Sequence, residues 1–138
     1  MVTTSRITLH TGGRGEVRDI TDQVRKEVAG SKVANGVVTL FVVGSTAAIS
    51  TIEYEPGLLQ DFGEAWERLV PQAMPYMHDR AWGESNGHSH IRSTILGPSL
   101  AVPLVDGVLT LGTWQQIVLV DFDIRPRTRE VVVQIIGE

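Results

Sequence analysis

The segment after residue 99 constrains the fold most strongly, because it consists of short apolar stretches separated by turn residues. Asp106-Gly107 divides its first part, and this dipeptide suits the type I′ turn of a tight β-hairpin. Two further stretches, residues 114–123 and 129–137, are rich in Val and Ile, which favour strands. Successive strands of this kind predict an antiparallel sheet. Their apolar faces exceed what short helices can cover, so we expect a second sheet from the same chain or from neighbouring copies.

The first part of the chain adds a strand, a helix and a second strand. Residues 5–11 alternate between apolar and polar side chains, as a half-buried strand does. A Gly-rich turn follows, and then Ile20, Val24 and Val28 recur at helical spacing. Residues 36–44 are β-branched and nearly continuous in apolar side chains, which predicts a strand buried on both faces.

The middle of the chain contains the other expected helices. Residues 45–54 predict a loop followed by a strand, Pro56 suits the first turn of a helix, and Pro71 ends that helix. One apolar stripe marks this helix: Leu58, Leu59, Phe62, Trp66 and Leu69. Residues 89–97 predict a short helix. Two or three helices beside mostly antiparallel strands predict one α+β domain over residues 1–138.

Composition narrows the class of protein. The chain has 138 residues, enough for one domain, and its net charge of −4 disfavours general binding to a nucleic-acid backbone. It has no cysteine, which excludes disulfides, thiolate zinc sites and a cysteine nucleophile. No apolar run reaches the ~18 residues of a membrane helix, and the N-terminus lacks the apolar core of a signal peptide. We therefore expect a cytoplasmic protein that binds neither nucleic acid nor membrane.

Three of the four histidines, His78, His88 and His90, lie in or beside the turn-rich segment 71–88. A connection of that length suggests a functional loop. Neutral imidazole is the commonest metal-binding side chain, and histidines two apart in an extended segment point to the same side. If residue 90 opens a helix, the geometry differs but the ligands can still converge. We predict a divalent metal, zinc first and nickel, copper or iron as alternatives; the competing interpretation is that all are polar loop histidines.

Carboxylates and hydroxyls near this region are further candidates. Glu53 and Asp61 could serve as general base, metal ligand or partner of a histidine. The competing interpretation is an ordinary surface acid, and it is less suited to Glu53, which follows an apolar, β-branched run. Ser45 and Thr46 follow a buried strand, where backbone amides and hydroxyls often bind phosphate or carboxylate groups. The alternative for this small-residue stretch is a tight connection between strands.

Two further candidate ligand-binding features lie in the C-terminal part of the chain. Trp114 suits a core or a subunit interface, and Gln115 beside it could reach a ligand. The run RPRTR, residues 125–129, places three arginines around a turn. Such a cluster can bind an anionic group, and a solvated turn explains it equally well.

With these residues assembled, the chain resembles the YjbQ family, also called UPF0047. The resemblance covers nearly the whole chain and is most specific over residues 87–123 and 126–138, with further matches at 45–57 and 75–78. It implies an α+β fold with a β-sandwich core and a homotrimer. It also implies a polar pocket that holds a metal or an anion near the subunit contacts. Members have been linked to a weak thiamine-phosphate synthase activity, which joins a pyrimidine pyrophosphate to a thiazole phosphate.

The family's pocket positions carry over to particular residues, with one departure. Many members have a histidine in an HTTA-like motif where this chain has Gly44, and those members often lack His88. We therefore expect His88 to replace the missing histidine, while His90 is the family's pocket histidine. The matching positions are Glu53, Asp61, His78, His90, Trp114 and Gln115.

The candidate residues and the family resemblance together suggest two classes of function. In the first, the protein is an enzyme in which a metal on the histidines binds a pyrophosphate, Glu53 or Asp61 acts as base, and Ser45, Thr46 and Arg92 contact the anion. Such a site suits transfer from a pyrophosphate, and it suits metal-dependent hydrolysis as well. In the second, the protein is a non-catalytic trimeric module that binds a metal, a small phosphorylated metabolite or a protein partner.

Overall fold

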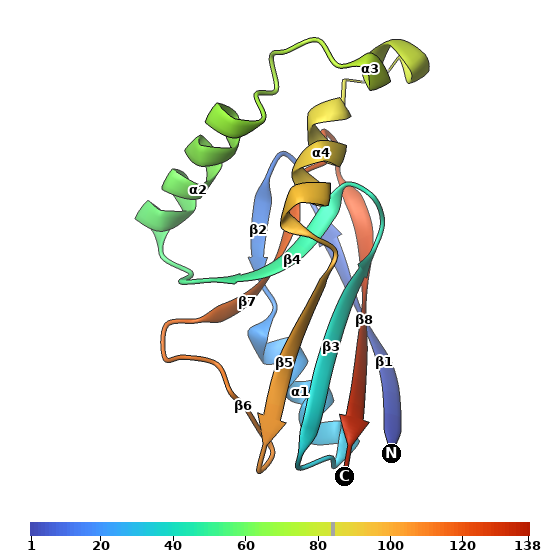
Figure 1. Cartoon of the computed structure of the whole chain (residues 1–138), viewed down its shortest axis with the longest axis vertical. Helices are drawn as coiled ribbons and strands as arrows, with labels where there is room; N and C mark the ends of the chain where they lie inside the picture. Colours follow the sequence, from blue (N-terminus) through green and yellow to red (C-terminus); the bar gives the residue numbers. More distant parts are fainter. Residues whose placement is uncertain (84) are drawn as a thin grey trace.

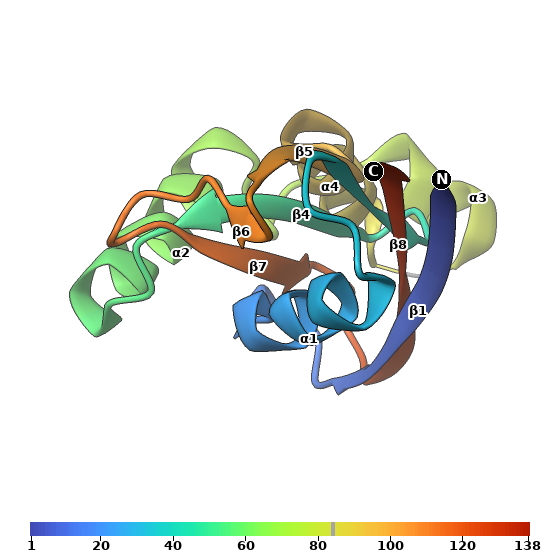
Figure 2. The same cartoon turned by 90° about the horizontal axis from the view of Figure 1, so that it is seen from below.

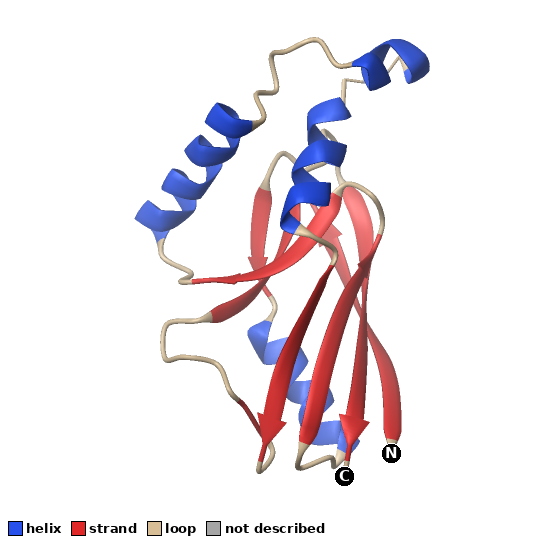
Figure 3. Cartoon of the chain, in the orientation of Figure 1, coloured by secondary structure: helices blue, strands red, loops and turns tan. Residues whose placement is uncertain are grey.

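The computed structural model describes residues 1–83 and 85–138, without the side chain of Trp82. Its strands form two sheets, and every strand pair between them is antiparallel (Figures 1 and 3). The larger sheet has the order β1 (Val2–Thr11), β8 (Arg127–Gly137), β3 (Gly36–Val43), β5 (Ser99–Val105), β6 (Val108–Leu109). The smaller sheet has the order β2 (Glu16–Asp19), β7 (Gln116–Asp121), β4 (Ala47–Ile52).

Four helices accompany the sheets in the described residues: α1 (Thr21–Ser31), α2 (Pro56–Leu69), α3 (Met77–Trp82) and α4 (Gly87–Leu96). The α+β class is confirmed, but the expected two or three helices are too few. α3 lies in the segment that we expected to be a loop, and at six residues it is too short to show helical periodicity in the sequence. None of the described helices is long and apolar enough to span a bilayer.

The main core lies between the two sheets, with α1 in the opening between β7 and β1 (Figure 2). α1 buries Val24 and Val28 there, and β8 contributes Val131, Val133 and Ile135. These β8 residues alternate with more exposed ones, as the pleat of a strand requires. The predicted second sheet is thus supplied by the same chain, and it covers one face of the larger sheet.

In the part of one chain that the structure describes, the other face of the larger sheet carries exposed apolar side chains. β3 buries Val38, Leu40 and Val42 toward the core, while Phe41 is 45% exposed and Val43 is 49% exposed. The prediction that residues 36–44 are buried on both faces is therefore wrong for the single chain. The continuous apolar pattern reflects one face that packs inside and a second face that the protomer leaves open.

The smaller sheet is covered on both faces. Ile117 and Leu119 of β7 point into the main core, whereas Val118 and Val120 point into a second core beneath α2 and α4. In this second core, Trp66 of α2 meets the ring of Phe122 edge-on, with ring centroids 5.1 Å apart. The predicted stripe of α2 is thus anchored by Trp66, while Leu69 at its end is 73% exposed.

Two strand boundaries differ from the sequence-based expectation. The expected Gly-rich turn before α1 contains β2, which pairs with β7 over Glu16–Asp19. The second strand of the predicted hairpin pairs only over Val108–Leu109. Short edge strands carry too few residues to show alternation, so tertiary pairing decides whether they form.

Candidate functional site

A cavity of about 390 Å³ lies where the β3–β4 turn, α3, α4 and the β7–β8 turn meet. Ser45 and Thr46, two of the predicted anion contacts, lie on its wall together with His78 and His90. Its volume is within the range of small-molecule sites. The full lining is Gly44, Ser45, Thr46, His78, Asn86, His90, Asp123, Arg127 and Arg129.

The two cavity histidines come from different helices. His78 belongs to the short helix α3 and His90 to α4, and their ring centroids are 4.5 Å apart at an interplanar angle of 61°. Gly87 allows this approach, because a Cβ there would lie only 2.6 Å from the Cβ of Tyr76, which precedes α3. The Asp79 carboxylate also accepts a hydrogen bond from the Gly87 backbone amide at 2.9 Å. The helix junction thus holds the two imidazoles side by side.

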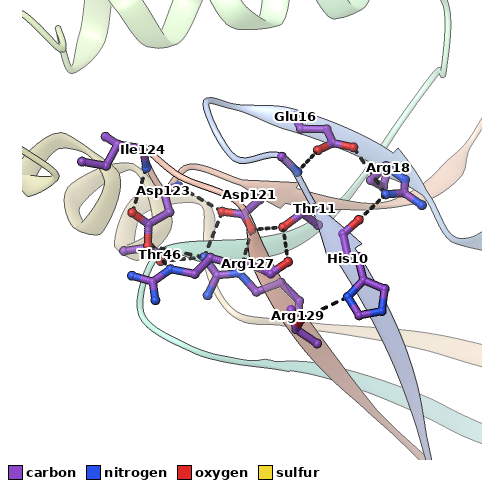
Figure 4. Close-up of polar contacts among 12 residues, drawn as sticks. His10, Thr11, Glu16, Arg18, Thr46, Asp121, Asp123, Ile124, Arg127 and Arg129 are labelled. Atoms are coloured by element: carbon purple, nitrogen blue, oxygen red, sulfur yellow. Dashed lines mark hydrogen bonds and ion pairs between the residues drawn. The ribbon is translucent and has the colours of Figure 1, made fainter.

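Beneath the cavity lies a buried network of arginines and carboxylates (Figure 4). Arg129 donates to both carboxylate oxygens of Asp121, through Nε at 2.7 Å and Nη2 at 2.9 Å. Arg129 Nη2 also donates to Thr46 Oγ1 at 2.6 Å, and Thr46 donates in turn to Asp123 Oδ2 at 3.0 Å. Arg127 Nε donates to the same Asp123 oxygen at 2.9 Å. Thr46 therefore links two Arg–Asp pairs.

The network turns its positive edge toward the cavity and its carboxylates inward. The Arg127 side chain is 37% exposed, whereas that of Asp123 is 1% exposed. Burial alone would raise the pKa of Asp123, but hydrogen bonds from Ile124, Thr46 and Arg127 outweigh it and lower the pKa. The Asp123 carboxylate stays ionised and is part of the wall, but its oxygens already accept from Thr46, Arg127 and the Ile124 amide, so the wall offers mainly guanidinium and hydroxyl donors.

Asp121 is held in the same way. Its burial would raise the pKa of the carboxyl, but hydrogen bonds from Arg129, Thr11 and the Asp123 amide lower it overall. The side chain is completely buried, so the negative charge is stabilised only by these donors. Asp121 is thus the anchor that holds the Arg129 guanidinium under the cavity.

Gly44 exposes the edge of Arg129 to the cavity. Its φ is +144°, and a Cβ at this position would lie 2.7 Å from Arg129 Nη1. A side chain here would therefore have to displace the arginine and would adopt a backbone conformation that L-residues rarely take. The space at residue 44 is already filled on one side by a guanidinium.

His88 does not join the cavity histidines. It is 3% exposed, its ring centroid lies 6.4 Å from that of Tyr76, and its Nε2 is 3.4 Å from Ser89 Oγ. Burial, followed by the nearby charge of Arg92, lowers the pKa of His88. The expected replacement of the Gly44 histidine by His88 is therefore contradicted, since His88 packs in the protein interior on the other side of α4.

Arg92 has contacts within the protomer that differ from the predicted anion contact. Its Nε and Nη2 donate to the Val70 carbonyl at 3.0 and 2.8 Å, and Nη2 also donates to Glu67 at 3.0 Å. The side chain is 10% exposed. Arg92 thus satisfies a carbonyl just past the end of α2 and ties that helix to α4, which makes its role structural.

The remaining predicted residues lie at the opposite end of the smaller sheet. Glu53 and Trp114 line a separate cavity of about 420 Å³, and Trp114 is 73% exposed there. Thr46 and Glu53 flank the two ends of β4, and at about 3.3 Å per residue the strand holds them roughly 20 Å apart. The predicted single pocket is therefore divided into two within one chain.

Asp61 and Gln115 also lie away from the histidines. Asp61 is exposed on α2. Gln115 donates from Nε2 to Thr51 Oγ1 at 3.0 Å and accepts from the Gly112 amide at 3.0 Å, so it braces the turn before β7. Neither side chain can act in the same chain on a group held by His90.

The residues present do not fit the predicted zinc site. Within residues 1–83 and 85–138, no group of three or more His, Cys, Asp or Glu side chains is placed to hold a metal ion. His78 and His90 can supply two imidazoles, but the nearby carboxylate of Asp123 already accepts from Thr46 and Arg127. Two guanidinium groups on the wall add positive charge. This donor set favours an anion over a divalent cation.

Several residues of the site were not predicted from the sequence. Asp121 and Asp123 read as the end of an apolar strand, and Asn86 read as part of a loop. Asn86 is 3% exposed on the cavity wall, and its Oδ1 has no hydrogen-bond partner among the described residues. The usable signal was the charge pattern across one turn, where Asp121 and Asp123 are followed by arginines 125, 127 and 129 at every second position, which suggests paired charges.

The chain is similar in sequence to known proteins over nearly its whole length. The sequence profile described as UPF0047 protein YjbQ-like matches residues 5–138. A UPF0047 protein of Archaeoglobus fulgidus is 44% identical over 128 residues, which are 93% of this chain and 97% of the relative. A UPF0047 protein of Methanothermobacter thermautotrophicus is 36% identical over 137 residues, 99% of this chain and 94% of the relative.

Solved structures agree with the sequence matches. The crystal structure of a YbjQ-like protein of unknown function from Sulfolobus solfataricus has a TM-score of 0.91 at 33% identity and covers 100% of both chains. A hypothetical protein from Aeropyrum pernix has a TM-score of 0.92 at 35% identity, over 99% of both chains. The profile match, the curated relatives and the fold are consistent with one another. This chain belongs to the UPF0047 protein YjbQ-like family.

Proposed function

We propose that the cavity between α3, α4 and the β7–β8 turn binds the phosphate or pyrophosphate group of a small metabolite. The observation that carries this proposal is the orientation of the charged network. Arg127 is exposed at the cavity, whereas its partner Asp123, which is also part of the wall, is almost completely buried. A bound phosphate would meet guanidinium donors, while both carboxylate oxygens of Asp123 already accept hydrogen bonds from the protein.

The other wall residues supply complementary contacts. Ser45 offers a hydroxyl, and the imidazoles of His78 and His90 can each donate or accept a hydrogen bond. A pair of imidazoles beside a bound pyrophosphate suits a reaction in which pyrophosphate leaves and a proton is exchanged. This supports a transferase of the thiamine-phosphate synthase type, and hydrolysis of the same bond would use the same groups. The non-catalytic alternative is a module that only binds the phosphorylated metabolite.

A homotrimer is part of the proposal. The number three comes from the family resemblance, while the open outer face of the larger sheet supports association. Phe41 and Val43 of β3 and Ile136 of β8 are each 45–49% exposed on that face, and exposed apolar surface of this kind marks contact sites. A neighbouring subunit would also offer a way to bring the Glu53 cavity of one chain to the histidines of another.

A divalent metal, zinc first, remains a second candidate ligand, because the ring centroids of His78 and His90 are only 4.5 Å apart. Its further ligands would have to come from the bound metabolite or from a neighbouring subunit. Such an ion would supply a Lewis acid for a phosphate oxygen. The phosphate-binding proposal does not require it.

Calorimetric titration with inorganic phosphate and pyrophosphate, with and without a chelator, tests the binding. We expect binding to persist in chelator and Arg127→Ala to weaken it about tenfold to a hundredfold, as the loss of a charged hydrogen bond would. Arg6→Ala is the matched control, because it likewise deprives a carboxylate, that of Glu130, of its ion pair, outside the cavity. Equal affinity of the native protein and Arg127→Ala for phosphate and pyrophosphate would contradict the proposal.

Activity separates the two classes of function. The native protein is incubated with a pyrimidine pyrophosphate and a thiazole phosphate, and released pyrophosphate is measured. Turnover that disappears in His90→Ala supports the transferase. Binding of the pyrophosphate substrate without turnover supports the non-catalytic module.

A further inference from the structure

A second cavity of about 320 Å³ adjoins the phosphate cavity. The two share three lining residues, Gly44, Ser45 and His90, so they lie next to each other. Beyond the shared residues, the second cavity is lined by Ala47, Ser93, Thr94 and Pro98. It contains no Lys, Arg, Asp or Glu among the described lining residues, in contrast to the arginines of the first.

One face of α4, together with Asn86 at the N-cap of the helix, forms a wall of both cavities. Asn86 and His90 line the first, and His90, Ser93 and Thr94 line the second. Residues three, four and seven apart share a face of a helix. The polar side chains on this face therefore follow a continuous line from one cavity to the next.

Two buried polar atoms on this line lack partners in the protein. Asn86 is 3% exposed and Ser93 is 4% exposed, and neither Asn86 Oδ1 nor Ser93 Oγ has a hydrogen-bond partner among the described residues. Buried polar atoms are nearly always paired in native proteins. One such atom therefore accompanies each cavity, at the places where a ligand or ordered water would supply the missing hydrogen bond.

Gly44 lies between the two cavities. Its missing side chain leaves Arg129 Nη1 uncovered, since a Cβ would come within 2.7 Å of that nitrogen. It also places no bulk at the boundary that both cavities share. Residue 44 thus determines whether a single molecule can extend from the arginines to Ser93.

We propose that the two cavities are subsites for one ligand, a monophosphate or pyrophosphate ester with a compact, uncharged body. The phosphate binds at Arg127 and the histidines, and the body binds against Ala47, Thr94 and Pro98. One hydrogen-bonding group on the body pairs with Ser93. This inference rests on the proposed phosphate site and adds the part of the ligand that gives selectivity. Each cavity holds the volume of roughly ten water molecules, at about 30 Å³ each, which suits a single ring.

Competition between inorganic phosphate, phenyl phosphate and a hydroxyphenyl phosphate, measured by calorimetry, tests the inference. We expect the native protein to bind phenyl phosphate about tenfold more tightly than inorganic phosphate, because the ring loses apolar contact with water. Thr94→Phe should fill the second cavity and abolish this preference while leaving the affinity for inorganic phosphate within about twofold. Thr94→Leu, a smaller change, should reduce the preference in part.

Two further variants sharpen the test. Ile95→Phe is the matched control, because Ile95 follows Thr94 on the same helix and is 61% exposed, so the preference should be retained. Ser93→Ala removes the unpaired hydroxyl and should abolish any advantage of the hydroxyphenyl ester over the phenyl ester, with phenyl phosphate binding unchanged.

The outcomes separate this inference from the proposed function. The native protein could bind phenyl phosphate no better than inorganic phosphate while Arg127→Ala still weakens the binding of inorganic phosphate. In that case the second subsite is refuted and the phosphate site stands. If Thr94→Phe keeps the full preference, the body binds elsewhere and the inference is also refuted. If the native protein binds no phosphate at all, both proposals fail.

Discussion

His88 and His90 are two residues apart on α4 and face opposite sides of it. His90 lines the cavity with His78, whereas His88 is buried beside Tyr76. In an α-helix two residues span about 200° of rotation, so adjacent-but-one side chains point away from each other. His88, Arg92 and Leu96, which are four apart, share the face that packs against the second core and the end of α2.

The burial of His88 predicts acid sensitivity. Its pKa is lowered in the folded protein, so the unfolded chain takes up a proton at a higher pH than the folded chain does. Stability from this residue is therefore fully present above the ordinary histidine pKa of about 6.5 and decreases as the pH falls below it. We expect His88→Gln to show a smaller loss of stability between neutral and mildly acidic pH than the native protein, in urea denaturation at each pH. His10→Gln, at an exposed position, is the control and should follow the native protein.

The Asp121–Arg129 pair predicts a large effect on stability. Arg129→Ala leaves a completely buried carboxylate without its bidentate partner, which should cost about 3–5 kcal/mol in the free energy of unfolding. Arg129→Lys keeps the charge but loses the planar fork and should be intermediate. Urea denaturation measures both. A loss below about 1 kcal/mol in Arg129→Ala would place this pair in the class of weak surface bridges instead.

Zinc uptake distinguishes the histidines by their positions. We expect any zinc bound by the purified protein to depend on His90 and His78, because these two histidines share a cavity wall. Elemental analysis after dialysis against zinc should show a loss of metal in His90→Ala and no change in His88→Gln. Equal loss in both variants would restore the three-histidine site that the described geometry does not form.

The outer face of the larger sheet predicts the oligomeric state. Phe41 lies opposite Val132 of β8 on that face and is 45% exposed. We expect the native protein to be a trimer by light scattering at micromolar concentration, and Phe41→Lys to shift it toward monomer by placing a charge in the contact. Ala29→Lys on the exposed surface of α1 introduces the same residue elsewhere and should leave the trimer intact. If the native protein is a monomer at this concentration, the predicted trimer is wrong.

Much of the fold could be read from residue patterns because those patterns are local. The Asp106-Gly107 turn, the alternation in β1 and the spacing of Ile20, Val24 and Val28 each act within a few residues of the chain. They predicted the antiparallel strands and α1 correctly. Patterns were insufficient for α3 and β2, whose six and four residues are too few for a period to appear.

The candidate site required the tertiary structure. The residue types alone showed which side chains were available: histidines near α3 and α4, hydroxyls after β3, and arginines after β7. It could not determine which of them meet, because Thr46 and Arg129 are 83 residues apart and become neighbours only through sheet packing. Likewise, about half a turn of helix separates His88 in the core from His90 at the cavity, while the length of β4 holds Glu53 away from both. The phase of α4 and the length of β4 are both fixed by backbone geometry. They therefore determine which side chains meet at the site.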